Sequence, residues 1–198
     1  MRVSELFYSL QGEGARAGEP SLFVRLSGCS AKFACAASGV ACDTEFESGR
    51  DLSRNDLAEL LRNMSADCHW IVWTGGEPAD QLTADDVAFF AGLGYLQAIE
   101  TSGVRPVPPG LDWVTVSPKV AEHVLAKHFP EGVSELKYVR HAGQAIPEPQ
   151  VQAVYYCLSP HSDGLTINVD NMRACIALCL ANPKWRLSLQ QHKLWQIR

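Results

Sequence analysis

Residues 69–99 read HWIVWTGGEPADQLTADDVAFFAGLGYLQAI, and this stretch decides the fold class. It opens on His69–Trp73, an apolar run rich in β-branched and aromatic residues that is typical of a buried strand. Thr83–Leu93 follows, with apolar residues on one helical face, a Thr-x-x-Asp capping pair at its start and a glycine after its end. Tyr95–Ile99 is a second apolar run. A strand, a helix and a second strand in this order predict a βα unit and hence neighbouring parallel strands.

The same two kinds of segment recur along the rest of the chain. Strands are predicted at Val3–Tyr8, Leu22–Leu26, Trp113–Val116, Glu135–Val139, Val154–Leu158 and Trp185–Leu189, and helices over Ser53–Met64 and at about Val120–Phe129 and Asp170–Ala181. These units are too few for eight strands and eight helices. We therefore predict an α/β fold with a mostly parallel sheet, as either a partial TIM-like βα barrel or an open sheet. In both, a ligand is expected at the carboxyl ends of the strands.

Size and composition limit the classes of protein to consider. The chain has 198 residues, 46% of them hydrophobic and 20% charged, which predicts one globular domain over residues 1–198. A formal charge of −5 argues against binding a nucleic acid backbone. The apolar run Cys175–Ala181 is too short to cross a membrane, and the first residues do not resemble a signal peptide, so we expect a cytoplasmic protein.

The loop after the Leu22–Leu26 strand holds three cysteines. Residues 28–44 read GCSAKFACAASGVACDT, which places Cys29, Cys35 and Cys42 within 14 residues. Three thiolates can hold a 4Fe-4S cluster with one open iron. They can also hold a structural zinc together with a histidine, or simply pack as small apolar groups. The spacing alone leaves these three interpretations open.

A second motif ends the His69–Trp73 strand. Residues 74–78 read TGGEP, so two glycines leave the backbone bare at the strand end, beside a carboxylate and a rigid proline. Such an edge could hold an ammonium group. Taken alone, however, a Gly-Gly turn between a strand and a helix is common. A three-cysteine loop after one strand and this turn after the next form a rarer combination.

With these two motifs, further segments resemble the 7-carboxy-7-deazaguanine synthases of the radical S-adenosylmethionine (radical SAM) superfamily. The segments are SLQGEG 9–14 with Gly18, FVRL 23–26, Gly28-Cys29, CDT 42–44, TGGEP 74–78, ETSG 100–103, SPK 117–119, ELK 135–137 and QHK 191–193. Together they extend over nearly the whole chain. The cysteine spacing departs from the superfamily's usual C-x3-C-x2-C, because here it is C-x5-C-x6-C. A second departure is Leu158-Ser159-Pro160, where many members have a Gln-Pro pair.

The resemblance implies a reaction and a set of partners. It implies a single radical SAM domain, a partial barrel, that converts 6-carboxy-5,6,7,8-tetrahydropterin into 7-carboxy-7-deazaguanine with loss of ammonia, in 7-deazapurine (queuosine-type) biosynthesis. The implied cofactors are a 4Fe-4S cluster, S-adenosylmethionine and Mg²⁺. The implied partners are the small pterin substrate, a low-potential electron donor such as flavodoxin or ferredoxin, and a second copy of the chain in a homodimer. No nucleic acid or membrane partner is expected.

The resemblance also assigns roles to residues. Cys29, Cys35 and Cys42 would hold the cluster, and Thr44 the Mg²⁺. The residues expected at S-adenosylmethionine are Ala41, Asp43, Gly76, Glu77, Ser117, Pro118, Lys119, Ser159 and Pro160. The residues expected at the substrate are Leu10, Gln11, Gly12, Glu13, Arg25, Thr74, His192 and the terminal Arg198.

Several of these residues also have an ordinary structural interpretation. Arg25 has a guanidinium that matches a substrate carboxylate, yet it could form a surface ion pair. Gln11 and Glu13 could belong to a polar turn, Asp43-Thr44 could cap a helix, and Lys119 could be a solvated surface lysine.

Two other functions compete with the synthase. One is a radical SAM activase that places a glycyl radical on another protein, which would need a wide open face. The other is a non-enzymatic binding module stabilised by zinc on the three cysteines and a histidine such as His69. A pocket of substrate size with Arg25 and Thr44 facing inward would favour the synthase.

Overall fold

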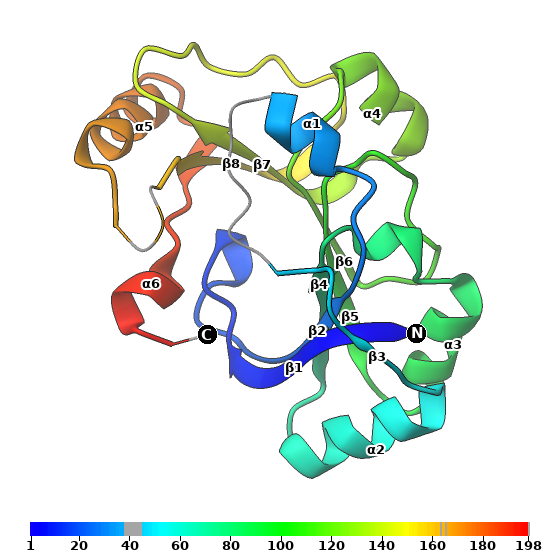
Figure 1. Cartoon of the computed structure of the whole chain (residues 1–198). Coiled ribbons are helices and arrows are strands. Elements are labelled where there is room, and N and C mark those ends of the chain that lie inside the picture. Colours follow the sequence, from blue (N-terminus) through cyan, green and yellow to red (C-terminus); the bar gives the residue numbers. More distant parts are fainter. Residues whose placement is uncertain (38–44, 163, 165, 198) are drawn as a thin grey trace.

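The computed structural model describes residues 1–37, 45–162, 164 and 166–197. Within these residues the strands form one sheet in the order β3-β1-β2-β4-β5-β6-β7-β8-β9 (Figure 1). The strands are β1 (Arg2–Leu10), β2 (Pro20–Leu26), β3 (Arg50–Asp51), β4 (Trp70–Gly75), β5 (Leu96–Thr101), β6 (Trp113–Val116), β7 (Val133–Arg140), β8 (Ala153–Pro160) and β9 (Trp185–Leu187). Each strand predicted from the sequence is present, whereas the two-residue β3 has no sequence signal.

The sheet is mostly parallel, as predicted, with an antiparallel margin. Every neighbouring pair from β2 to β9 is parallel, but β1 runs antiparallel to both β2 and β3. The segment between β1 and β2, residues 11–19, has no helix long enough to cross the sheet, so the second strand returns beside the first. Since β3 and β9 are edges in the described chain, the sheet curves without closing and forms a partial barrel.

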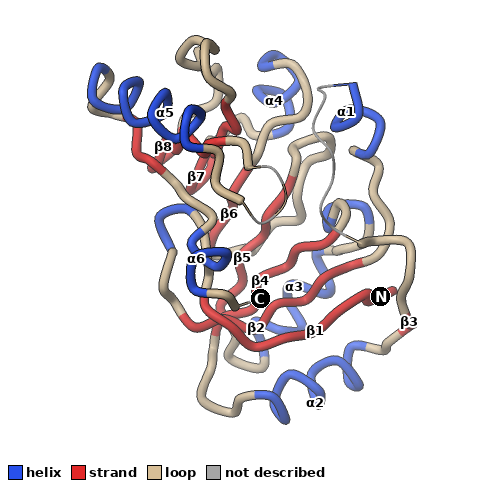
Figure 2. The backbone as a smooth tube through the Cα atoms, turned by 60° about the vertical axis from the view of Figure 1, so that its left-hand side comes forward, coloured by secondary structure: helices blue, strands red, loops and turns tan. Residues whose placement is uncertain are grey.

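Helices cover the outer face of the curved sheet (Figures 1 and 2). The longer ones are α2 (Arg54–Met64), α3 (Ala84–Gly92), α4 (Glu122–His128) and α5 (Val169–Ala181). The predicted capping pair is confirmed, because Thr83 and Asp86 form a reciprocal capping box, and Ser53 with Asp56 forms a second one at the start of α2. The short elements α1 (Lys32–Ala37), α6 (Gln191–Trp195), η1 (Gly14–Arg16) and η2 (Pro78–Asp80) were not predicted. Each has too few residues to show a helical period.

The main core lies between the sheet and its helices. Leu22, Val24 and Leu26 of β2 are fully buried there, together with Leu57 of α2 and Phe90 of α3. Three cysteines outside the cysteine loop are buried. Cys157 lies in β8, Cys175 lies in α5 and Cys68 lies just before β4, whereas Cys179 of α5 is half-buried. No helix in the described chain is both long and apolar enough to cross a membrane.

Candidate active site

The concave face of the sheet changes from apolar to polar along its central strands. Its apolar row consists of Phe23, Val72 and Ala98, which pair across β2, β4 and β5. Two residues further along each strand come Arg25, Thr74 and Glu100, and Arg25 pairs with Thr74. Side chains two residues apart lie on the same face of a strand. The carboxyl ends of these strands therefore present a cation, a hydroxyl and a carboxylate to one space.

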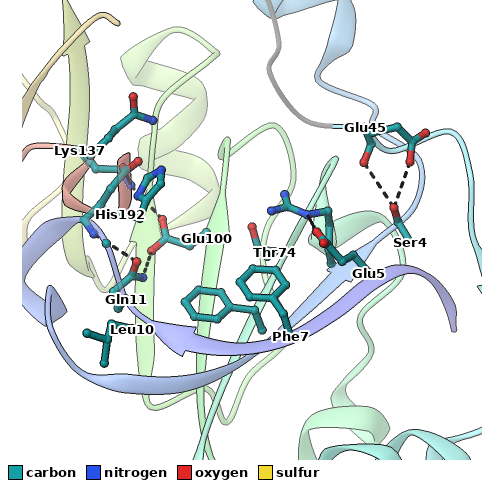
Figure 3. Close-up of a pocket in the computed structure, with 15 residues that line it drawn as sticks. Ser4, Glu5, Phe7, Leu10, Gln11, Glu45, Thr74, Glu100, Lys137 and His192 are labelled. Atoms are coloured by element: carbon teal, nitrogen blue, oxygen red, sulfur yellow. Dashed lines mark hydrogen bonds and ion pairs between the residues drawn. The ribbon is translucent and has the colours of Figure 1, made fainter. Parts of the chain in front are cut away.

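That space is a cavity of about 670 Å³, within the usual range for a small-molecule site. The cavity is lined by Ser4, Glu5, Phe7, Leu10, Gln11, Gly12, Glu13, Phe23, Arg25, Glu45, Thr74, Glu100, Lys137, Gln190 and His192. Figure 3 shows Lys137, His192, Glu100 and Gln11 at one end, Ser4, Glu5 and Glu45 at the other, and Thr74 and Phe7 between them. All predicted substrate residues that the structure describes line this cavity, and Arg198 lies outside the described residues.

A buried cation joins the acidic side chains at one end of the cavity. The Lys137 Nζ lies 2.6 Å from the Glu13 carboxylate and 3.2 Å from that of Glu100. The Gln11 side-chain amide donates to the other oxygen of Glu100 at 3.0 Å. Glu135, two residues before Lys137 on β7, accepts from the backbone N–H of Ala15 at 2.7 Å and so holds η1 under this end of the cavity. Gln11 and Glu13 are thus part of a charged network and not of an exposed polar turn.

The network separates the pKa values of its two carboxyl groups. Burial alone would raise the pKa of Glu13, but the charge and hydrogen bond of Lys137 outweigh burial and bring this pKa below its ordinary value. Burial raises the pKa of Glu100, and the negative charges of Glu135 and Glu13 add to burial against the opposing effect of Lys137. Burial works to lower the pKa of Lys137, but the surrounding carboxylates outweigh it and raise this pKa. Glu100 therefore takes up a proton more readily than Glu13 as the pH falls.

This difference predicts a pH dependence of stability. Because the folded state raises the pKa of Glu100 above its unfolded value of 4.5, ionised Glu100 destabilises the fold increasingly as pH rises from there through the folded pKa. We expect Glu100→Gln to gain stability relative to the parent over that interval, by about 1.4 kcal/mol for each unit of the shift. Urea unfolding at several pH values between 4.5 and 8 measures the difference. The exposed Glu131→Gln is the matched control, and a pH-independent difference for Glu100→Gln would contradict the assignment.

The cysteine loop and the Gly-Gly turn lie against each other. Cys29 lies three residues after the end of β2 and Cys35 lies in α1, and both are half-buried. The Gly76 N–H donates to the Leu26 carbonyl at 3.2 Å, and the Glu77 N–H donates to the Gly28 carbonyl at 3.0 Å. A Cβ at Gly76 would collide with the Gly28 carbonyl and with Cys29, so only glycine allows this approach. Ala41, Cys42, Asp43 and Thr44 lie outside the described residues.

Glu77 is fully buried, and its carboxylate binds the end of the neighbouring strand. It accepts from the Thr101 hydroxyl at 2.6 Å, from the Ser102 N–H at 2.9 Å and from the Ser102 hydroxyl. The carboxylate therefore fixes the Gly75-Gly76 edge relative to the end of β5. The N–H of Glu77 donates to Gly28 and its carbonyl accepts from the Asp80 N–H at 3.1 Å, so the whole residue works inside the protein and would act on a ligand through the glycine edge that it holds.

A second cavity of about 320 Å³ lies between α1 and the ends of β6 and β7. Pro118 and Lys119 line it together with Ala34 of α1 and Arg140 of β7. Ser117, just before them, donates its N–H to the Thr101 carbonyl at 2.8 Å. At the end of β8, Ser159 pairs with Val139 and Pro160 with Arg140. Of the residues predicted for S-adenosylmethionine, those that the structure describes thus follow the carboxyl edge of the sheet outside the first cavity, and Gly76 among them lies against the start of the cysteine loop.

Comparison with known proteins adds a family to this geometry. No protein-family model matches the chain. The 7-carboxy-7-deazaguanine synthase of Bacteroides thetaiotaomicron is 36% identical over 200 residues, which cover 100% of this chain and 98% of that protein. The chain belongs to the 7-carboxy-7-deazaguanine synthase family. The synthase of Caulobacter vibrioides is 35% identical over 211 residues, covering 96% of each protein.

Solved structures agree with this family. The crystal structure of QueE from Escherichia coli superposes with a TM-score of 0.72 at 27% identity, covering 96% of this chain and 94% of that one. The predicted resemblance and the radical SAM enzyme class are thereby confirmed, in preference to the zinc-stabilised module and the protein activase.

The sequence did not assign roles to several residues of this synthase-family site. Glu100 and Lys137 lie within the ETSG and ELK segments, so the signal that they matter was present, but the face of the strand on which each lies was not known. Glu5 and Phe7 had no such signal. They reach the cavity because of an irregularity in β1 that no sequence pattern indicates.

Proposed function

We propose that this synthase-family protein converts 6-carboxy-5,6,7,8-tetrahydropterin into 7-carboxy-7-deazaguanine with loss of ammonia. The observation that carries the proposal is one cavity with Arg25, paired with Glu5, at one end and the hydrogen-bonding network of Gln11, Glu13, Glu100 and Lys137 at the other. Arg25 would bind the substrate carboxylate through its planar fork of donors. Gln11, Glu13 and Glu100 would accept from and donate to the polar edge of the pterin. A volume of about 670 Å³ gives ample room for a bicyclic ring.

The residues next to this cavity suit the cofactors of a radical SAM enzyme. We assign the 4Fe-4S cluster to Cys29, Cys35 and Cys42, and Mg²⁺ to Thr44, which lies directly before the cavity residue Glu45. When bound, a reduced cluster with S-adenosylmethionine would supply the 5′-deoxyadenosyl radical chemistry, and the cavity residues would hold carbon 6 of the pterin for hydrogen abstraction. The bare backbone at Gly76, packed on the cysteine loop, suits the amino acid end of S-adenosylmethionine.

The second cavity suits the rest of that cofactor. Pro118 and Lys119 line it beside α1, and Ser117, Ser159 and Pro160 lie at the neighbouring strand ends. We add Ala41 and Asp43 to this group through their backbone, and Glu77 through the Gly75-Gly76 edge that its buried carboxylate fixes. The chain itself then has three tasks, which are to orient carbon 6, to bind both ends of the pterin and to keep water away. His192 of α6 packs on Gly12 and covers one end of the cavity.

Further partners follow from this chemistry. We propose a low-potential electron donor of the flavodoxin or ferredoxin kind, and the reducing cytoplasm as the compartment, because thiolates that hold a cluster must stay reduced. We also propose a homodimer. The apolar side chains of Ile176 and Leu180 on α5 support it, since Leu180 is 79% exposed.

Electron paramagnetic resonance of the reduced, anaerobically reconstituted protein tests the cofactor assignment. We expect a 4Fe-4S signal that changes when S-adenosylmethionine is added, followed by 7-carboxy-7-deazaguanine in a turnover assay with the tetrahydropterin, detected by mass spectrometry. A silent spectrum with one bound zinc per chain would reject the cluster. A normal spectrum without product would retain the cluster and reject the substrate.

A further inference from the structure

Strand β1 contains a bulge that changes which residue faces Arg25. Val3 pairs with Leu26 of β2, but the register shifts between Val3 and Glu5, so that Glu5 pairs with Arg25. In a regular antiparallel ladder Ser4 would take that place. A bulge inserts one residue and redirects the side chains beyond it. Here the bulge places the Glu5 carboxylate directly opposite Arg25.

The same bulge turns Phe7 toward the cavity, where it meets Phe23 of β2. Phe7, two residues after Glu5, pairs with Phe23 of β2, and their rings stack with centroids 4.7 Å apart and planes 4° apart. Leu6 packs on the opposite side, in the core that also contains Val3. Val3 and Leu6 are three residues apart, so they can share a face of the strand only because of the extra residue between them.

Arg25 is held on two sides by residues that the bulge places. Its Nε donates to the Glu5 carboxylate at 3.2 Å, and its guanidinium carbon lies 5.8 Å from the centre of the Phe7 ring. The Arg25 side chain is 23% exposed and that of Glu5 is 33% exposed, so salt screens their ion pair less than it screens a pair on the surface. A guanidinium can bind carboxylates along its Nε side or at its end. Because Glu5 uses the Nε side and Arg25 lines the cavity, we infer that the end of the guanidinium is the part that would bind a ligand.

We propose that Glu5 is a positioning residue, which through Arg25 makes the cavity select ligands that carry a carboxylate. The inference rests on the proposed role of Arg25 in binding the substrate carboxylate. Glu5 bears the same charge as that group, so simple electrostatics predicts that Glu5 weakens binding. Positioning predicts the opposite, since a fixed fork loses less conformational freedom when it binds.

Two fluorescent probes separate these effects in the full-length reconstituted protein. The probes are 6-carboxypterin and unsubstituted pterin. The dissociation constant of pterin divided by that of 6-carboxypterin measures selection for the carboxylate, and a higher ratio means stronger selection. We expect Glu5→Ala and Glu5→Asp to lower this ratio about tenfold, the latter because the shorter side chain does not reach the Arg25 Nε. Glu5→Gln should preserve the ratio within about twofold, since its amide oxygen still accepts from Nε. The exposed Glu59→Ala on α2 is the matched control and should change nothing.

The expected pattern is distinctive, because Glu5→Asp keeps the charge but loses selection, whereas Glu5→Gln loses the charge but keeps selection. Arg25→Gln should abolish selection, and adding Glu5→Ala to it should have no further effect. If Glu5→Ala or Glu5→Asp leaves the ratio unchanged or raises it, the positioning role is wrong. If Arg25→Gln itself leaves the ratio unchanged, the assignment of Arg25 under the proposed function fails, and the positioning role fails with it. Should Glu5→Ala not fold, the comparison of Glu5→Asp with Glu5→Gln decides.

Discussion

Replacing Lys137 with methionine is expected to lower the free energy of unfolding by about 3–5 kcal/mol and to reduce turnover at least a hundredfold. Methionine has a similar length but leaves the carboxylates of Glu13 and Glu100 without the cation that lies 2.6 Å and 3.2 Å from them. Glu135, close along β7, adds further negative charge. Removal of one partner from a buried charged cluster costs much more than the pair itself contributes, because the remaining charges stay desolvated.

Urea unfolding at pH 7 and steady-state turnover measure the two effects. The control is Lys127→Met on α4, whose side chain is exposed and for which we expect a change within about 0.5 kcal/mol. Adding Glu100→Gln to Lys137→Met should restore part of the stability, since one uncompensated carboxylate is then neutral, but no turnover. Equal stabilities of the Lys137→Met protein and the parent would show that the cluster is hydrated and not coupled as the distances indicate.

Replacing Cys29 with alanine is expected to reduce turnover below detection and to remove the reduced-cluster signal. Three thiolates are needed to hold three irons of the cubane while the fourth stays open, and two do not suffice. Cys29 also lies against Gly76, so the substitution removes an iron ligand at the point where the cysteine loop and the Gly-Gly turn meet. Iron content and paramagnetic resonance of the reconstituted variant measure the loss.

Cys179→Ala is the matched control, because Cys179 is half-buried on α5 and packs in the core far along the chain from the cysteine loop. This variant should keep both iron and turnover. Because the spacing C-x5-C-x6-C is unusual, the same comparison with Cys179→Ala is worth making for each of the three loop cysteines. If Cys29→Ala still forms product, another group holds the iron and the assignment of the cysteine loop must change.

The fold could be predicted from the sequence because its signals are local. The Thr83-x-x-Asp86 pair gives the start of α3, and short apolar runs gave the positions of the parallel strands. The short α6 could not be predicted in the same way, because a five-residue helix carries no period of its own. The antiparallel direction of β1 follows from the short connection to β2, and the apolar runs that predict strands say nothing about strand direction.

The site could be predicted only in part. The predicted substrate residues from Leu10 to His192 share one cavity, but the link between them, Lys137, bridges Glu13 and Glu100 from three separate segments. No pattern in one segment reveals such a bridge. Glu5 was missed for a different reason, since a single bulge shifts every later side chain of β1 to the other face.

The C-terminal segment of the chain packs on the segment after β1 and covers one end of the cavity. This arrangement affects both the folding and the thermal inactivation of the protein. The Gln191 N–H donates to the Gly12 carbonyl at 2.8 Å, and the Gly14 N–H donates to the Ser188 hydroxyl at 2.9 Å. In Figure 1 the red α6 accordingly lies beside the blue segment that follows β1. Closing a loop of this length is entropically costly and slow, so this wall of the cavity is expected to form late in folding.

The same wall is weakly anchored. Leu194 is 53% exposed and Trp195 39% exposed, so α6 has little buried surface to hold it in place. Segments of this kind open locally at a much lower free energy than the whole fold. On warming, the protein would therefore lose its ligand through detachment of α6 while the sheet and its outer helices are still intact. The temperature at which activity ends would then lie below the melting temperature of the fold.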